Sequence, residues 1–278
     1  MTVPNLTLNN GIEIPQLGFG VFQVPDAETE AAVTEALAAG YRSIDTAAIY
    51  GNERSVGQAI AKSGIPRNEL FITTKLWNSD QGRESTRPAY EASLEKLGLD
   101  HVDLYLIHWP TPAADRYAET WEAMEELYAA GAMRAIGVSN FLPDHLRRVV
   151  DMGGTVPAVN QIEVHPGLHQ SEVTEFGAKY DIATEAWSPL AQGGDLLGHP
   201  VIVDIAGRVG RTPAQVILRW HLQQGRIVIP KSVTPSRIRE NFDVFGFELS
   251  ADDLAAIDGL EAPGGAGRIG PNPADFNR

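Results

Sequence analysis

The residues of this chain that could do chemistry begin with a carboxylate and a phenol close together in the sequence. Asp45 ends the segment Tyr41-Arg-Ser-Ile-Asp45, which follows an alanine-rich amphipathic run and the helix-stopping Gly40. This pattern predicts a short buried strand with an acid at its end. Tyr50 follows in a turn-like loop, so the two residues could be a proton donor and the group that tunes it. The structural alternative is that Asp45 caps a turn and Tyr50 packs as an amphipathic aromatic.

Two further ionisable residues end the next predicted strands. Lys75 ends Phe71-Ile-Thr-Thr-Lys75, and His108 ends Leu104-Tyr-Leu-Ile-His108. Each could instead be structural, Lys75 as a solvated surface residue and His108 as a hydrogen-bonded core histidine. Their joint occurrence at equivalent strand ends is harder to explain by stability, because burying several charges costs free energy unless the charges pair.

Together these four side chains suit the protonation of a developing alkoxide. A free tyrosine has a pKa of about 10, and an adjacent Lys75 ammonium would lower the pKa of Tyr50. Asp45 would keep Lys75 charged and in place, while His108 could orient or polarise a carbonyl oxygen. This is the chemistry of carbonyl reduction, and its hydride must come from a cofactor because no side chain can donate one.

The elements that must position these residues repeat a single pattern, in which a short apolar strand is followed by an amphipathic helix. We predict strands at 17–20, 42–45, 70–76, 102–108, 134–139, 158–164, 182–187 and 227–230, and helices at 28–39, 54–63, 84–97, 116–130, 143–151, 171–180, 212–223 and 237–242. Eight such units predict an α/β fold of the closed (β/α)₈ barrel type. A doubly wound open sheet is the alternative, because periodicity alone does not close a barrel.

The two ends of the chain differ from this repeat. Asn9-Asn10-Gly11 lies between two short apolar segments and predicts an N-terminal β-hairpin. The tail from Pro263 is rich in Gly and Pro and is expected to be an irregular segment over one end of the barrel. No linker composition interrupts the series, so we predict a single domain over 1–278.

Composition limits the partners and the cofactors. The formal charge of −14 and a pI near 4.9 disfavour nucleic acid and anionic membranes. The sequence has no long apolar run and no leader pattern, so we expect no transmembrane helix and no signal peptide. We therefore predict a cytoplasmic location. With no cysteine there is no disulfide or thiolate metal ligand. His165 and His169 have i, i+4 spacing, but Pro166 and Gly167 separate them, so we expect no metal.

Five separated motifs, in this order, resemble those of the aldo-keto reductase family. They are Gly40 to Glu53, Lys75 within Ile72 to Leu76, His108 within Leu106 to Pro110, Ile136 to Asn140, and Ile229 to Ser232. The resemblance spans nearly the whole chain and is greatest to the short bacterial members typified by 2,5-diketo-D-gluconate reductase. It implies a (β/α)₈ barrel and a catalytic tetrad of Asp45, Tyr50, Lys75 and His108, in which Tyr50 is the general acid.

The resemblance also implies NADPH, bound in an extended form without a Rossmann domain. In that binding mode Trp187 would stack on the nicotinamide, and Ser139, Asn140 and Gln161 would hydrogen-bond its carboxamide. Gly265 to Gly270 formally matches G-x-G-x-x-G, but no predicted strand precedes it and no helix follows, so we treat the match as chance.

One basic segment departs from the acidic composition. Lys231 to Arg239 contains three cations and no acid. We predict that Lys231, Ser232 and Arg237 hold the adenosine 2′-phosphate, with Asn241 near the adenine; an ordinary basic helix start is the alternative. Further cofactor contacts are expected from Val233 and from the loop after the seventh predicted strand, where the paired glycines 193 and 194 would let the backbone approach the pyrophosphate; ordinary surface-loop glycines are the alternative. These residues are Ser188, Pro189, Leu190, Gln192 and Val233.

Aromatic residues after three predicted strands could form a substrate pocket beside His108. They are Phe22, Trp77 and Trp109, for which core packing is the alternative. The loop after His108 and the C-terminal tail are short beside those of the longer animal members of the family, which suggests an open, less selective pocket. The predicted protein is a monomeric, NADPH-dependent reductase of aldehydes, ketones, small dicarbonyls or sugar-derived keto acids. Two other functions stay open: a Schiff-base aldolase using Lys75 or Lys231, and a non-catalytic NADP(H)-sensing subunit.

Overall fold

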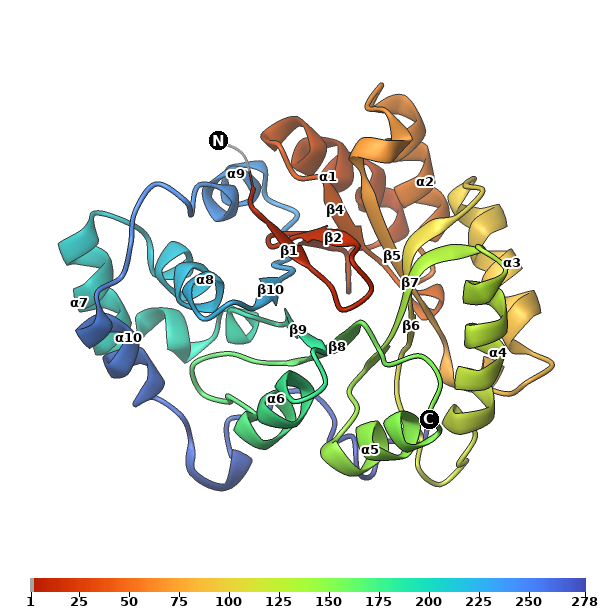
Figure 1. Ribbon diagram of the computed structural model, residues 1–278. Helices are drawn as coiled ribbons and strands as arrows, with labels where there is room; N and C mark the ends of the chain where they lie inside the picture. Colours follow the sequence, from red (N-terminus) through yellow and green to blue (C-terminus); the bar gives the residue numbers. More distant parts are fainter. Residues whose placement is uncertain (1–2) are drawn as a thin grey trace.

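Eight parallel strands form the centre of the protein in a computed structural model that describes residues 3–278 (Figure 1). They are β3 (Phe19–Gly20), β4 (Ser43–Asp45), β5 (Phe71–Leu76), β6 (Val102–Ile107), β7 (Met133–Ser139), β8 (Val159–Glu163), β9 (Ala183–Trp187) and β10 (Ile227–Val228). Each strand pairs with the next in the chain. The sheet closes on itself because the Gly18 amide donates to Val228 O at 2.8 Å and the Val228 amide donates to Gln16 O at 3.0 Å. The predicted (β/α)₈ barrel is confirmed, and the open sheet is wrong.

Helices follow the strands and cover the outside of the barrel. The predicted ones are α1 (Asp26–Ala39), α2 (Glu53–Lys62), α3 (Thr86–Leu97), α4 (Tyr117–Ala129), α5 (Pro143–Asp151), α6 (Ser171–Ala178), α8 (Pro213–Gln223) and α9 (Pro235–Phe242). None of the helices within residues 3–278 is long and apolar enough to cross a lipid bilayer.

Two helices were not predicted, α7 (Pro200–Val209) and α10 (Ala251–Asp258). Both have start or end signals in the sequence, but they do not fit the pattern of one helix after each strand. Pro200 occupies the first turn of α7 and Gly210 ends it with a left-handed conformation. The Ser250 hydroxyl caps α10 by accepting from the Asp253 amide, and the Asp253 carboxylate accepts from the Ser250 amide.

The N-terminal hairpin closes one end of the barrel. Strands β1 (Asn5–Thr7) and β2 (Glu13–Pro15) pair antiparallel, as predicted. The Asn9 side chain donates to Pro157 O at 3.0 Å, and the Asn10 side chain donates to Arg134 O at 3.0 Å. Both acceptors lie near strand starts, so the hairpin covers the amino ends of the strands and leaves the carboxyl ends for chemistry.

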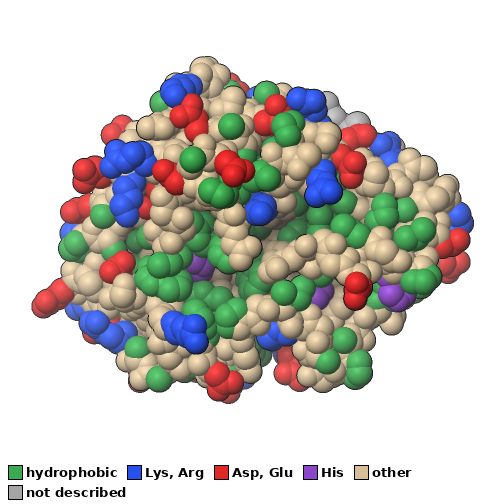
Figure 2. Space-filling model, turned by 180° about the vertical axis from the view of Figure 1, so that it is seen from behind, with side chains coloured by type: hydrophobic (Ala, Val, Ile, Leu, Met, Phe, Trp, Pro, Cys, Tyr) green, Lys and Arg blue, Asp and Glu red, His purple; other side chains and the backbone are tan. Residues whose placement is uncertain are grey.

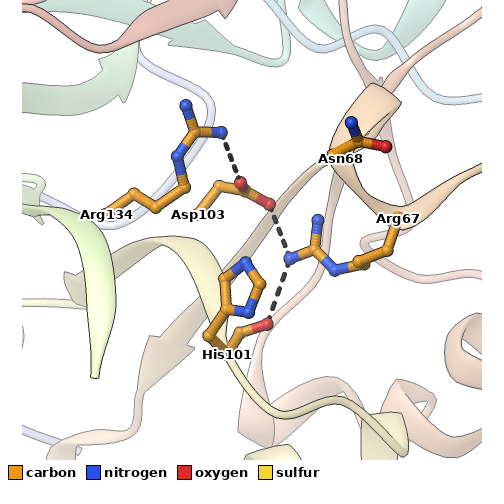
Figure 3. Close-up of a pocket in the computed structure, with 5 residues that line it drawn as sticks. All are labelled: Arg67, Asn68, His101, Asp103 and Arg134. Atoms are coloured by element: carbon orange, nitrogen blue, oxygen red, sulfur yellow. Dashed lines mark hydrogen bonds and ion pairs between the residues drawn. The ribbon is translucent and has the colours of Figure 1, made fainter. Parts of the chain in front are cut away.

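An ion-paired cluster holds three strands together at that same amino end (Figure 3). The buried Asp103 carboxylate of β6 contacts Arg67 at 2.7 Å and Arg134 at 2.9 Å, and accepts from the Ile72 amide at 2.8 Å. These residues line an open hollow with His101. Because Asp103 pairs with both guanidinium groups, we interpret this cluster as structural.

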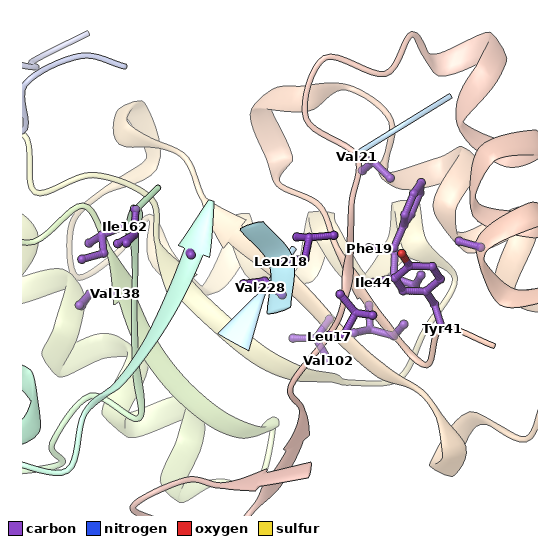
Figure 4. Packing of buried hydrophobic residues seen from close by; sticks show 14 of the residues in the cluster. Leu17, Phe19, Val21, Tyr41, Ile44, Val102, Val138, Ile162, Leu218 and Val228 are labelled. Atoms are coloured by element: carbon purple, nitrogen blue, oxygen red, sulfur yellow. The ribbon is translucent and has the colours of Figure 1, made fainter. Parts of the chain in front are cut away.

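The main apolar core lies between the barrel and its helices. Figure 4 shows part of it, where Leu218 of α8 and Val228 of β10 are both fully buried. A smaller cluster inside the barrel includes Leu8 and Ile14 of the hairpin region with Leu104 of β6. Each large aliphatic side chain buried in this way contributes about 1.5 to 3 kcal/mol to stability. This packing holds the strands, and therefore their ends, in fixed positions.

The tail crosses the carboxyl ends of the strands, as expected. The Glu163 carboxylate at the end of β8 accepts from the amides of Ile269 at 2.6 Å and Gly270 at 3.0 Å. Further along, the Asn78 side chain donates to Arg278 O at 2.7 Å. The tail is therefore fixed at two points across the barrel end that carries the predicted catalytic residues.

Candidate active site

The structure brings the four predicted catalytic residues together at the carboxyl ends of the strands. Asp45 ends β4, Lys75 lies one residue before the end of β5, and His108 follows β6. Tyr50 lies in a short 3₁₀ turn, Ala48–Tyr50. The Lys75 Nζ atom is 2.7 Å from Asp45 Oδ1 and 5.2 Å from the centre of the Tyr50 ring. The rings of Tyr50 and His108 are 5.6 Å apart.

The loop that carries Tyr50 is held by a buried asparagine. Asn52 accepts from the Thr46 hydroxyl at 2.8 Å and donates to Val21 O at 3.0 Å, so it ties this loop to the segment after β3. Gly51 ends the 3₁₀ turn with a φ of 70°. Such a left-handed residue is least costly as glycine, which explains the Tyr-Gly-Asn sequence at this point.

Lys75 is a buried cation with a matched partner. Its side chain is completely buried, and its ammonium donates to Asp45 Oδ1 and, at 2.8 Å, to Thr46 O. Burial alone would lower the pKa of Lys75, but Asp45, Tyr50 and Glu185 together more than offset that effect and the pKa is raised. Lys75 is therefore charged at neutral pH.

Tyr50 differs from the expectation in one respect. Burial raises the pKa of its phenol to about 12, although Lys75 acts to lower it. The expected direction of the Lys75 effect is correct, but desolvation is larger, so the expected lowering of the Tyr50 pKa is wrong. The phenol therefore holds its proton at neutral pH, as a proton donor must.

His108 is neutral, and its buried Nδ1 atom has no hydrogen-bond partner among the described residues. Burial, and then the Lys75 charge, lower the pKa of His108 well below its ordinary value. A buried N–H without an acceptor is rarer than an unused acceptor, so we assign the proton of the neutral ring to Nε2.

The aromatic side chains expected to form the substrate pocket lie near Tyr50 and His108. Phe22 is 46% exposed, and its ring lies 5.1 Å from that of Tyr50. The centre of the His108 ring lies 5.3 Å from that of Trp77 and 6.5 Å from that of Trp109. Figure 2 views the face opposite the hairpin and shows a hollow with mainly hydrophobic walls, a histidine inside it, and Lys or Arg side chains around it.

One wall residue was missed because it comes from the tail. The Phe276 ring packs against Trp109 with 4.4 Å between ring centres. Nothing in the local sequence distinguishes Phe276 from an exposed tail residue, because its partner lies far away in the chain. The predicted pocket is therefore less open than expected, because the tail covers Trp109.

The residues expected to hold the nicotinamide carboxamide form one hydrogen-bonded cluster. The Ser139 hydroxyl donates to Gln161 O at 2.8 Å. The Asn140 side chain donates to His108 O and to Ser139 Oγ, both at 3.0 Å. The Trp187 indole donates to Asn140 Oδ1 at 2.9 Å, which fixes the ring expected to stack on the nicotinamide.

Gln161 connects this cluster to the catalytic residues. Its Nε2 atom donates to Asp45 Oδ2 and to Glu185 Oε2, each at 2.8 Å. Glu185 lies on β9 and was not predicted as a site residue. Strand alternation could have found it, because Glu185 and Trp187 are two positions apart and share a face of the strand.

The basic segment contains two unpaired cations. Lys231 and Arg237 are exposed and form no ion pair within residues 3–278, whereas Arg239 pairs with Glu35 at 2.6 Å. The Ser232 hydroxyl accepts from the Thr234 amide at 3.1 Å, which leaves its own proton to donate. Of the other predicted residues here, Asn241 is buried and Val233 is exposed.

The loop after β9 has an unusual backbone. Ser188 and Gln192 both have positive φ, 47° and 55°, although neither is glycine. Pro189 O lies 3.3 Å from His221 Nε2, and Leu190 packs against the main core. Non-glycine residues in this conformation concentrate at ligand sites, and this loop follows Trp187 directly.

Comparison with known proteins establishes the family. Residues 16–199 and 194–262 match the Aldo/keto reductase family. The chain belongs to the aldo-keto reductase family. An aldo-keto reductase of Mycolicibacterium smegmatis is 56% identical over 274 residues, 99% of this chain and 98% of that protein. Methylglyoxal reductase DkgA of Escherichia coli K12 is 50% identical over 272 residues, 98% of this chain and 97% of DkgA.

Solved structures agree with the barrel. The apo form of Gox0644 has a TM-score of 0.94 and 48% identity over 98% of each chain. A Gox0644 variant in complex with NADPH has a TM-score of 0.94 and 47% identity over 99% of each chain. As an aldo-keto reductase, this protein is an oxidoreductase of carbonyl compounds that uses a nicotinamide cofactor.

This aldo-keto reductase shows no candidate metal centre in the part of the chain that the structure describes, where no three His, Asp or Glu side chains are arranged to hold an ion. His165 instead lies 3.2 Å from Glu163, the residue that also holds the tail. Its role in this structure is to support the tail attachment.

Proposed function

We propose that this aldo-keto reductase reduces aldehydes and ketones to alcohols with NADPH, and that Tyr50 is the general acid. The observation that carries the proposal is the buried Asp45–Lys75 ion pair next to a protonated Tyr50, with neutral His108 beside it. A charged lysine at this place lowers the free energy of the phenolate that forms when the proton leaves.

When bound, the reduced nicotinamide supplies the hydride. The His108 Nε2–H group donates a hydrogen bond to the carbonyl oxygen of the substrate and orients it. As negative charge develops on that oxygen, the Tyr50 hydroxyl transfers its proton there and the alcohol forms. Lys75 stabilises the resulting phenolate until Tyr50 recovers a proton from water, and Asp45 keeps Lys75 in place.

The residues at the basic segment suit NADPH. Lys231 and Arg237 are cations without an acidic partner among the described residues, and Ser232 offers a free hydroxyl proton. Unpaired cations beside a hydroxyl donor match the adenosine 2′-phosphate, which NADH lacks. We assign Asn241 and Val233 to the adenine end, and Ser188, Pro189, Leu190 and Gln192 to the pyrophosphate.

We infer small dicarbonyls and sugar-derived keto acids as substrates. The aromatic wall of Phe22, Trp77 and Trp109 offers apolar surface close to Tyr50 and His108. DkgA of Escherichia coli, a methylglyoxal reductase, supports the dicarbonyl class. The same proposal takes the chain to be a single-domain, cytoplasmic monomer.

A Schiff-base aldolase is disfavoured by the state of Lys75. Imine formation requires a neutral amine, whereas Asp45 raises the pKa of Lys75 against the effect of burial. Trapping with borohydride in the presence of a ketone should therefore leave Lys75 unmodified, as shown by peptide mass spectrometry. A borohydride-stable adduct at Lys75 would support the aldolase instead.

The direct test of the proposed function is NADPH oxidation by the wild-type protein, followed by absorbance. Methylglyoxal, phenylglyoxal and 2,5-diketo-D-gluconate are the substrates to compare, and we expect turnover with at least one. Tight NADPH binding without turnover of any of them would favour the sensing subunit over the reductase.

A further inference from the structure

Glu185 is a buried carboxyl group that the mechanism above does not use. It is 1% exposed and lies on β9 inside the barrel. No Lys or Arg pairs with it within residues 3–278; its hydrogen bond there is the one it accepts from Gln161 Nε2 at 2.8 Å. A buried carboxyl group without a cation of its own costs stability, so its presence calls for a functional reason.

The position of Glu185 fixes the orientation of the Gln161 side chain. An amide nitrogen has two protons, and Gln161 Nε2 donates one to Asp45 and the other to Glu185. With both protons used, the amide can offer a ligand only its oxygen. Gln161 is one of the residues expected at the nicotinamide carboxamide, whose NH₂ group needs an acceptor.

We propose that Glu185 is a positioning residue for carbonyl reduction: its carboxylate holds the Gln161 amide nitrogen, so that the amide oxygen accepts from the cofactor carboxamide. This inference rests on the proposed function. Asp45 cannot hold the amide alone, because a single carboxylate would leave one N–H free to turn toward the ligand.

The arrangement also links cofactor affinity to pH. Burial, and then the Asp45 charge, raise the pKa of Glu185 to about 7, while Gln161 and Lys75 act in the opposite direction. The charged groups facing Glu185 are Asp45 from β4 and Lys75 from β5; β8 presents the neutral Gln161, and the β10 partner Ile227 is apolar. Protonation removes the charge that strengthens the hydrogen bond from Gln161, so the amide is held less firmly below pH 7.

The test compares NADPH binding by the wild type and Glu185→Gln between pH 6 and pH 8. The glutamine side chain keeps an oxygen acceptor of the same length but cannot become charged. We expect Glu185→Gln to bind NADPH several-fold more weakly than the wild type at pH 8 and equally at pH 6. Titration of the 2′-phosphate, with a pKa of about 6, affects both proteins alike and cancels in the comparison.

Two further variants separate positioning from a general structural effect. Asp253→Asn neutralises another buried carboxylate, on α10, and should follow the wild-type pH dependence. In a Gln161→Ala background, Glu185→Gln should change NADPH affinity no further, because Glu185 acts through the amide that has been removed.

Each result has a distinct meaning. An unchanged pH dependence in Glu185→Gln, or equal weakening at every pH, would overturn the positioning role while leaving the reductase intact. A further loss of affinity in the Gln161→Ala background would overturn it too. A wild-type protein that does not bind NADPH would instead overturn the proposed function and this inference together.

Discussion

At the scale of single residues, the site combines one paired cation with groups that are kept neutral. Lys75 and Asp45 satisfy each other, whereas burial keeps Tyr50 protonated and His108 uncharged. Breaking a buried ion pair by removing one partner typically costs about 3 to 5 kcal/mol, because the other charge is left without compensation. In the proposed mechanism, Lys75 and Asp45 therefore organise the tetrad, while Tyr50 and His108 are the groups that reach the substrate.

We predict that the buried Glu185 carboxylate lowers the stability of the fold while it strengthens NADPH binding. Its pKa rises from an ordinary value of 4.5 in the unfolded chain to about 7 in the fold. The folded state therefore binds more protons between these values, and stability falls as the pH rises from about 4.5 to 7. Glu185→Gln should be more stable than the wild type at pH 8, by about 3 kcal/mol. The difference should disappear near pH 4.5.

Urea unfolding followed by circular dichroism at both pH values measures this difference. Asp253→Asn is again the control, because that carboxylate is stabilised by Arg208 and by its helix cap, and its loss should destabilise the fold. Equal stability of Glu185→Gln and the wild type at pH 8 would show that the buried carboxylate carries no cost.

At the scale of elements, the start of α9 carries the proposed 2′-phosphate site, where the chain would distinguish NADPH from NADH. Arg237 lies in the first turn of α9, whose N-cap Thr234 makes no side-chain cap hydrogen bond. Arg239, in the same helix, is already paired with Glu35. The two arginines thus offer a matched comparison between a cation that is free to bind phosphate and one that is not.

Arg237→Ala should weaken NADPH binding by about tenfold or more, because a hydrogen bond to a charged group contributes about 1.5 to 3 kcal/mol. NADH binding should not change, so the preference for NADPH falls. Fluorescence titration with both cofactors gives the two dissociation constants. Arg239→Ala should bind both cofactors as the wild type does; the same NADPH loss in both variants would argue against a specific phosphate site.

At the scale of the whole molecule, the two chain ends close opposite ends of the barrel. The hairpin covers the amino ends of the strands, and the tail crosses the carboxyl ends through Glu163 and Asn78. The tail also passes Trp187, the residue expected to stack on the nicotinamide. A Cβ atom at Gly270 would come within 2.4 Å of the Trp187 indole, so this glycine allows the tail to pass beside the ring.

Gly270→Ala should therefore displace the Trp187 indole and weaken NADPH binding, with little change in kcat at saturating cofactor. Initial rates measured against NADPH concentration separate the two quantities. Gly207→Ala is the control, because nothing lies within 4 Å of a Cβ atom at that α7 position. Unchanged KM for NADPH in Gly270→Ala would mean that the ring adapts without loss.

Much of this architecture could be predicted from the sequence because it depends on local patterns. Asp45, Lys75 and His108 each lie at or next to the end of a recognisable strand, and the barrel places strand ends together. Contacts between distant segments could not be predicted in this way. Phe276 meets Trp109 through the path of the tail, and Glu185 meets Asp45 through Gln161 across the barrel.

The pKa of Tyr50 is a further property that local sequence patterns could not predict. The sequence places a lysine near the phenol but does not give the depth of burial, and here desolvation outweighs the nearby charge. Helices α7 and α10 carry clear end signals, so the sequence could have predicted both. The pattern of one helix after each strand left no place for them.

The measurement that tests the central claim most directly is single-turnover reduction of methylglyoxal by Tyr50→Phe, with NADPH binding measured on the same sample. Phenylalanine keeps the ring between Phe22 and His108 but removes the proton. We predict unchanged NADPH affinity and a fall in the rate of the chemical step of about 10²-fold or more, the scale of general acid catalysis. A Tyr50→Phe variant that reduces methylglyoxal at the wild-type rate would contradict the assignment of Tyr50 as the proton donor.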